Sequence, residues 1–242
     1  MLLYNCQMKG TQKKGIKTMT QKIDRRKSYF VVFDTETANG LDDPIVYDLG
    51  FAVVDKKGTV YETNSLIIRE VFYGMKDLMK SAYYADKIPK YEEEISNGQR
   101  KVVSLYEARK IFQDVCKKYN VKACIAHNAR FDYRSTSKTQ RYLTKSKYRF
   151  FLPYGIELWD TMKMANDTIC KQVHYKEFCY NNGYLTKNGR VRKTAEILYR
   201  YISGEHDFNE EHTGLADVLI EKEIFAHCIK QHKPMRKLAF GA

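Results

Sequence analysis

The chain has 242 residues, of which 42 are Lys or Arg and 29 are Asp or Glu, so its formal net charge is +13. A hydrophobic share of 43% with only 4 Pro excludes a disordered polyelectrolyte and a Pro-rich linker, and no apolar run approaches the ~20 residues of a membrane span. The excess of positive charge points to nucleic acid as an anionic partner, although a solubilising surface has the same composition.

The first 27 residues hold eight basic residues and one acid, with few large apolar side chains and no helical periodicity. We therefore predict a disordered basic tail over residues 1–27, one domain over residues 28–235 and a short C-terminal tail over residues 236–242. Met19 is an alternative start. The tail lacks the apolar run of a secretory signal, and six scattered cysteines fit reduced thiols, so we expect a cytoplasmic protein without a membrane partner.

Three strands are expected in the first part of the chain. Residues 28–34 (SYFVVFD) form an apolar run that predicts a buried strand with acids at its end. Residues 44–55 and 59–69 predict two further strands, which a turn at residues 56–58 joins into an antiparallel hairpin. Residues 70–100 are mixed in composition and are expected to form helical pieces and loop.

The second half of the chain alternates helices and strands. Ser104 and Glu107 form a capping box at the start of a helix expected over residues 104–119. Two short strands follow, each leading into a helix, and three more helices come after them. The strands are expected at residues 123–126 and 156–159, with Asp160 as a helix cap, and the last helices at residues 175–181, 193–202 and 214–231. This order favours one α/β domain with a mixed five-stranded sheet, antiparallel in the hairpin and parallel elsewhere, flanked by helices.

Acidic residues cluster in three short segments. Asp34 and Glu36 lie two residues apart in a predicted strand, so both carboxylates share one face and repel each other unless a cation lies between them. HNARFD at residues 127–132 and HTGLAD at residues 212–217 carry matching chemistry far along the chain.

With DTET at residues 34–37, these segments resemble the three motifs of the DEDDh 3′–5′ exonucleases, a group that includes the proofreading epsilon subunit of bacterial DNA polymerase. The resemblance covers about residues 28–231 and is closest in kind to stand-alone bacterial or bacteriophage members. It implies a ribonuclease-H-like fold and release of nucleoside 5′-monophosphates from nucleic-acid 3′ ends. Four acids would hold two Mg²⁺ or Mn²⁺ ions, and one histidine would be the general base. These residues are Asp34, Glu36, Asp132, Asp217 and His212.

The spacing of the third segment sets a condition on the local structure. His212 and Asp217 would be about 140° apart on an ideal helix, so they could not both face the metal ions from within it. We therefore expect His212 in a loop and a helix start near Thr213 or Gly214.

Substrate contacts are expected from Thr35, Asn128 and Phe131, with packing of the motifs as an equal alternative. The first motif continues into residues 38–41 (ANGL), where many relatives have Thr-Gly, which leaves the contacts to the terminal nucleotide open.

A basic stretch over residues 134–149 begins with Arg134, Lys138 and Arg141 and has tyrosines between its basic residues. It suits single-stranded nucleic acid, and a solvated helix face above packed tyrosines is the alternative. We expect a nucleic acid with a free 3′ end as partner, single-stranded DNA first, and a polymerase or replication protein as a further candidate. The alternative function is a nucleic-acid-binding or polymerase-accessory protein whose exonuclease site is vestigial.

Overall fold

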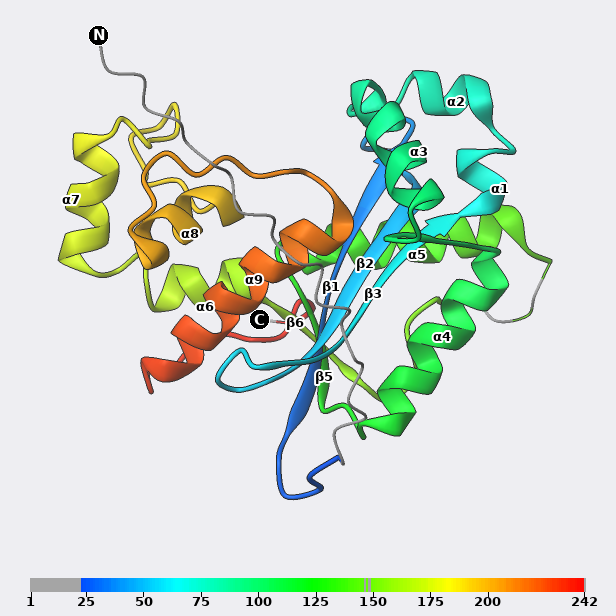
Figure 1. Cartoon of the computed structure of the whole chain (residues 1–242). Helices are drawn as coiled ribbons and strands as arrows, with labels where there is room; N and C mark the ends of the chain where they lie inside the picture. The colour runs from blue at the N-terminus through cyan, green and yellow to red at the C-terminus, as the bar shows by residue number, and fades with distance from the viewer. Residues whose placement is uncertain (1–22, 146, 148, 242) are drawn as a thin grey trace, which may run out of the picture.

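The computed structural model describes residues 23–145, 147 and 149–241 (Figure 1). Most of the predicted N-terminal tail, and Tyr148 of the basic stretch, lie outside the described residues. The elements in chain order are β1 (Tyr29–Ala38), β2 (Ile45–Asp55), β3 (Val60–Ile68), α1 (Arg69–Phe72), α2 (Lys76–Lys80), η1 (Ala85–Lys87), α3 (Ile88–Ser96), β4 (Lys101–Val103), α4 (Leu105–Lys118), β5 (Ala123–Ala126), α5 (Ala129–Leu143), β6 (Glu157–Asp160), α6 (Thr161–Asp167), α7 (Val173–Asn181), α8 (Ala195–Ser203) and α9 (Gly214–Lys230). Within this described part of the chain, no helix is long and apolar enough to cross a membrane.

Six strands form one mixed sheet in the order β4-β3-β2-β1-β5-β6. The neighbours β1–β2 and β2–β3 are antiparallel, whereas β3–β4, β1–β5 and β5–β6 are parallel. The predicted mixed sheet with an antiparallel hairpin is confirmed. The predicted count of five strands is wrong, because β4 adds a sixth. This strand has only three residues, too few to show the alternation by which a strand is recognised in a sequence.

The first strand is longer than its apolar run. β1 continues to Ala38, because β2 still supplies partners for Thr37 and Ala38 after the apolar residues end. Asp34 and Glu36 therefore lie inside the strand and not at its end. The register shifts directly after Glu36, and such bulges bend a strand and redirect its side chains.

Two hydrophobic cores lie on opposite faces of the sheet. Figure 1 shows α6, α8 and α9 on one side of the strands and α1, α3 and α4 on the other. Alternate residues of β1 face the two cores: Phe33 packs against Phe112 of α4, with ring centroids 5.7 Å apart, and Phe30 packs against Phe225 of α9 at 5.1 Å. Because Asp34 and Glu36 have the same parity as Phe30, their side chains point toward α9.

Local sequence signals place several helix ends correctly. The capping box of Ser104 and Glu107 is present at the start of α4. Asp160 caps α6, since its carboxylate accepts a hydrogen bond from the backbone N–H of Met162 at 2.9 Å. The region over residues 70–100 holds α1, α2, η1 and α3, in agreement with the expected helical pieces.

The C-terminal residues lie along the outer strand β6. The backbone N–H of Asp160 donates to the carbonyl of Lys237 at 2.7 Å, and the N–H of Ala239 donates to the carbonyl of Leu158 at 2.8 Å. Ala239 is fully buried. The segment that was predicted as a short tail thus extends the sheet by one bridge.

Candidate functional site

Three acids from two elements meet at the α9 side of the sheet. Asp34 and Glu36 project from β1, and Asp217 projects from the first turn of α9. One carboxylate oxygen from each lies within 4.8 Å of the other two. The expectation that Asp34 and Glu36 share a face is confirmed. The Oδ1 atom of Asp217 is buried and has no hydrogen-bond partner among the described residues, so the group is short of a cation or a donor.

A buried ion pair fixes the start of α9. The backbone N–H of Gly214 donates to the carboxylate of Asp48 at 2.9 Å. Asp48 lies opposite Glu36 in the strand ladder and also accepts hydrogen bonds from Arg100 at 2.8 Å and Tyr91 at 3.0 Å. Arg100 offsets part of the charge of Asp48, which still adds to the rise in the pKa of Glu36 and of Asp217.

The last of the four predicted acids, Asp132, lies in the first turn of α5. It is 2% exposed and accepts a hydrogen bond from the Thr35 hydroxyl at 2.8 Å. It lines the same cleft as Asp34 and Asp217 but does not belong to the group of oxygens within 4.8 Å. Asn128 precedes α5 in a left-handed conformation with φ 62°, which turns the chain from β5 into the helix.

His212 lies in the loop before α9, as its spacing from Asp217 predicts. Its φ is +50°, and the helix begins two residues later at Gly214. The imidazole stacks on the ring of Tyr84, with centroids 4.7 Å apart and an interplanar angle of 13°. Its Nδ1 atom lies 3.7 Å from a carboxylate oxygen of Glu210. His212, Glu210 and Asp217 form a second group whose ligand atoms lie within 4.8 Å of one another.

Sequence reasoning missed four residues of this site. Glu221 follows Asp217 by one helical turn and is 2% exposed; the signal is an acid at a core-facing position of a helix that is otherwise apolar there. Glu210 lies two residues before the recognised histidine. Tyr84, which lines the cleft, and Lys87, whose ammonium donates to the carbonyl of Glu211 beside it, come from the region that shows no periodic pattern, so only the fold brings them here. The Lys87 ammonium lies 4.2 Å from the Tyr84 ring.

The carboxylates are held in conditions that favour their protonated forms. Burial, with further repulsion from the neighbouring acids, raises the pKa of Glu36 to about 9 and that of Asp217 to about 8. Burial also raises the pKa of Asp132 to about 7, against the effect of its hydrogen bond, and the pKa of Asp34 lies well above its usual value because of burial and Asp132. Lys87 opposes this rise at Glu36 and Asp217. When the carboxylates are ionised, the single ammonium of Lys87 offsets only part of their negative charge.

His212 is shifted in the opposite sense. Partial burial, and then the ammonium of Lys87, lower its pKa below the usual 6.5. The ring is therefore neutral near pH 7 and has a nitrogen free to accept a proton.

The acid cleft, of about 390 Å³, is bordered by a larger aromatic hollow of about 770 Å³. Thr35, Phe131 and Tyr84 line both of them. Leu41 and Tyr83 complete the aromatic hollow and are 73% and 86% exposed. Two of the predicted substrate residues, Thr35 and Phe131, thus lie between the acids and an open apolar surface, and Asn128 lines the acid cleft itself.

The predicted basic residues of α5 do not line the acid cleft. Arg134 donates to the carbonyl of Leu41 at 2.9 Å, and Lys138 forms an ion pair with Asp43. Both side chains therefore hold the loop that borders the aromatic hollow. Arg141 is exposed, and Tyr133 packs between Phe150 and Phe240, whereas Tyr142 is 66% exposed.

No family model and no curated protein matches the chain. Among solved structures, exonuclease X in complex with 5′ overhanging duplex DNA is similar over 83% of this chain and 91% of that chain, with 18% identity and a TM-score of 0.40.

Proposed function

We propose that the protein is a metal-dependent 3′–5′ exonuclease of the DEDDh type, with a ribonuclease-H-like fold. The observation that carries the proposal is the meeting of Asp34, Glu36 and Asp217 with oxygens within 4.8 Å of one another. Three acids at this distance, two of them buried and Asp34 half-buried, repel each other, and a protein keeps such a group only where a cation or a proton offsets it.

The donor set fits hard divalent cations. All the predicted ligands are carboxylates, which Mg²⁺ and Mn²⁺ prefer, and Asp217 Oδ1 is buried without a partner among the described residues. Asp34, Glu36 and Asp217 would hold one ion, and Asp132, which reaches the cleft from α5, would complete the site for a second. When bound, the ions would activate a water and stabilise the leaving 3′ oxygen of a phosphodiester.

His212 supplies the proton acceptor in this proposal. Its lowered pKa keeps the ring neutral at pH 7, and its ligand nitrogen lies within 4.8 Å of an Asp217 oxygen. Stacking on Tyr84 and the nearby Glu210 carboxylate restrict the orientation of the ring. A restricted neutral imidazole beside the acids is suited to take a proton from the attacking water.

The aromatic hollow gives a reason for action at a chain end. Tyr83, Tyr84 and Phe131 offer flat faces for a base, and Leu41 closes the hollow beside them. A terminal nucleoside held there would leave its phosphate at the acids of β1. We propose single-stranded DNA with a free 3′ end as the substrate, and a polymerase or replication protein as a partner.

A strand-shortening assay tests the proposal. A 5′-labelled single strand should be shortened stepwise with Mg²⁺ or Mn²⁺, should release nucleoside 5′-monophosphates and should remain intact with EDTA. Asp34→Ala should abolish the reaction. Asp77→Ala, which removes an exposed acid that pairs with Lys80, is the matched control and should keep full activity.

Two further substrates separate the alternatives. A circular single strand should be resistant, and cleavage of it would contradict an exonuclease. Tight binding of the 3′ end without turnover under either ion would favour the vestigial-site alternative.

A further inference from the structure

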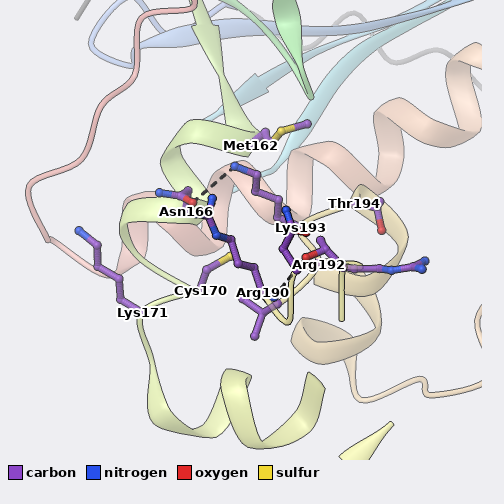
Figure 2. A pocket seen from close by; sticks show the side chains of 11 residues that line it. Met162, Asn166, Cys170, Lys171, Arg190, Arg192, Lys193 and Thr194 are labelled. Atoms are coloured by element: carbon purple, nitrogen blue, oxygen red, sulfur yellow. Dashed lines mark hydrogen bonds between the residues drawn. The ribbon is translucent and has the colours of Figure 1, made fainter. Parts of the chain in front are cut away.

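A second hollow, of about 870 Å³, adjoins the acid cleft and has the opposite charge. It lies between α6 and the segment over residues 186–194, which is folded back on itself by a bridge between Leu185 and Val191. Figure 2 shows the side chains of Lys171, Arg190 and Lys193 around it. We call this space the basic hollow.

The residues that line the basic hollow include four cations and no acid: Lys171, Arg190, Arg192 and Lys193. The Arg192 guanidinium donates to the carbonyl of Leu185 at 3.1 Å, and the Lys193 ammonium lies 3.5 Å from the amide oxygen of Asn166. Both of these partners are neutral. An uncompensated cluster of this kind attracts anions.

Of the other two cations, the Arg190 guanidinium lacks a partner among the described residues and Lys171 shares an acid with another cation. Within the described part of the chain, the Arg190 guanidinium has neither a hydrogen-bond acceptor nor an ion-pair partner. Lys171 lies 3.7 Å from Asp167, but Arg236 already holds that carboxylate at 2.8 and 3.0 Å. The charge of the basic hollow is therefore available to a ligand.

The basic hollow lies beside the acid cleft. Met162 and Thr194 line both spaces. His127, at the end of β5, joins them further: its Nε2 atom lies 2.8 Å from the carbonyl of Lys193, and its Nδ1 atom lies 2.9 Å from the Thr161 hydroxyl. A chain of phosphates that leaves the acids in this direction passes directly into positive charge.

We propose that the basic hollow binds the phosphodiester backbone of the nucleic acid whose 3′ end occupies the acid cleft. The inference rests on the proposed exonuclease function. The hollow is larger than one phosphate, and its floor is apolar at Met162, Cys170 and Val191. It therefore suits a nucleotide unit with its phosphate on the cations and its sugar or base on the floor. The backbone belongs either to the cleaved strand or to a complementary strand.

The test combines binding and turnover in the full-length protein. Arg190→Gln/Lys193→Gln removes two of the uncompensated charges. Lys101→Gln/Lys110→Gln removes two exposed charges from β4 and α4, on the other side of the sheet, and is the matched control. Anisotropy of a 5′-labelled 12-mer, measured in EDTA so that the strand stays intact, should show weaker binding for the first variant only. For this variant, the slope of log K against log [salt] should become less negative by roughly one to two.

Turnover with Mg²⁺ supplies the second measurement. A dinucleotide has one phosphodiester and ends at the acid cleft, so its kcat/KM should be equal in both variants and the wild type. The KM of the 12-mer should rise in the Arg190→Gln/Lys193→Gln variant, with kcat unchanged. Arg190→Lys, which keeps the positive charge, should have the KM of the wild type.

A single strand and a duplex with a recessed 3′ end together identify the source of the phosphates. A loss of affinity for the single strand and for a duplex with a recessed 3′ end assigns the cleaved strand, whereas a loss for the duplex alone assigns its complement. Equal affinities of the Arg190→Gln/Lys193→Gln variant and the control variant for both substrates would overturn the inference. A loss of dinucleotide kcat/KM in the first variant as large as its loss for the 12-mer would overturn it too. A wild type that binds the 12-mer but shortens no substrate would count against the proposed function instead.

Discussion

Gly50 of β2 and Gly214 of α9 lie backbone against backbone. A Cβ atom on Gly50 would lie 2.1 Å from the carbonyl carbon of Gly214, and a Cβ on Gly214 would lie 2.6 Å from the Gly50 nitrogen. This approach lets the first turn of α9 reach β1, so that Asp217 meets Asp34 and Glu36. Any side chain at either glycine would push the helix away from the strands.

Gly50→Ala should therefore damage both stability and the site. We expect a loss of roughly 1–3 kcal/mol in the free energy of unfolding, the range of overpacked cores, measured by urea titration. Activity at a temperature where the variant is fully folded should fall further, because Asp217 is displaced. Gly40→Ala is the control, since nothing lies within 4 Å of a Cβ there, and it should change stability by less than about 0.5 kcal/mol. Equal stability of the two variants would contradict the close packing.

The crowded acids predict that the metal-free protein loses stability as pH rises. Their folded pKa values of about 7 to 9 at Asp132, Asp217 and Glu36 lie above the ~4 of unfolded carboxyl groups. The folded state thus holds extra protons, whose contribution is complete at low pH and is lost as pH passes through the folded values. Between pH 7 and 8.5 in EDTA, we expect the free energy of unfolding to fall on the order of 1 kcal/mol per pH unit.

Mg²⁺ or Mn²⁺ should reverse this trend, because the ions favour the ionised carboxylates. The rise in Tm on adding metal should be larger at pH 8.5 than at pH 7. Asp34→Asn should weaken both effects, since one of the repelling charges is removed. A metal-free Tm that rises between pH 7 and 8.5 would contradict the assignment of these pKa values.

Lys87 should set the acid limb of the pH–rate profile. Its ammonium lowers the pKa of His212, so Lys87→Gln should raise that pKa and move the acid limb of kcat to higher pH, by up to about one unit. The measurement is kcat against pH at saturating metal and substrate. Lys90→Gln, three residues further along the chain, is the control. It removes a 2.8 Å contact with Glu211 and should leave the acid limb of kcat at the wild-type pH.

Thr35 should act through Asp132. Its hydroxyl donates to the Asp132 carboxylate at 2.8 Å and lowers the pKa of that group. Thr35→Val should weaken Mn²⁺ binding about tenfold or more, as outer-sphere partners of metal ligands do, in calorimetric titration at pH 7.5. Thr37→Val, two residues along the same strand, removes a hydroxyl with no hydrogen bond to another described residue and should bind Mn²⁺ like the wild type.

Local signals in the sequence predicted much of this fold. The capping box of Ser104, the cap at Asp160 and the helix start at Gly214 each depend on a few adjacent residues, and each is confirmed. The short strand β4 and the extension of β1 to Ala38 could not be predicted, because pairing with β3 and β2 stabilises them and their own residues do not.

The residues of the site likewise fall into those that a local sequence pattern marks and those that it does not. Spacing within a strand brings Asp34 and Glu36 to one face, and this is confirmed, whereas their catalytic roles stay a prediction. Tyr84 and Lys87 reach the site only through the fold, so no periodic pattern marks them, whereas Glu210 lies two residues before His212 in the same loop. Glu221 carries a weak signal, since an acid on the buried face of a helix is costly without a partner.

The strand-like pairing of Leu238 with Trp159 has a consequence for solubility. An uncovered outer strand presents unpaired backbone groups on which another chain can build, and β6 would be such a template. Residues 236–241 occupy part of it, while β4 at the opposite margin is only three residues long. Residues 236–241 thereby oppose self-association, and their removal should promote aggregation.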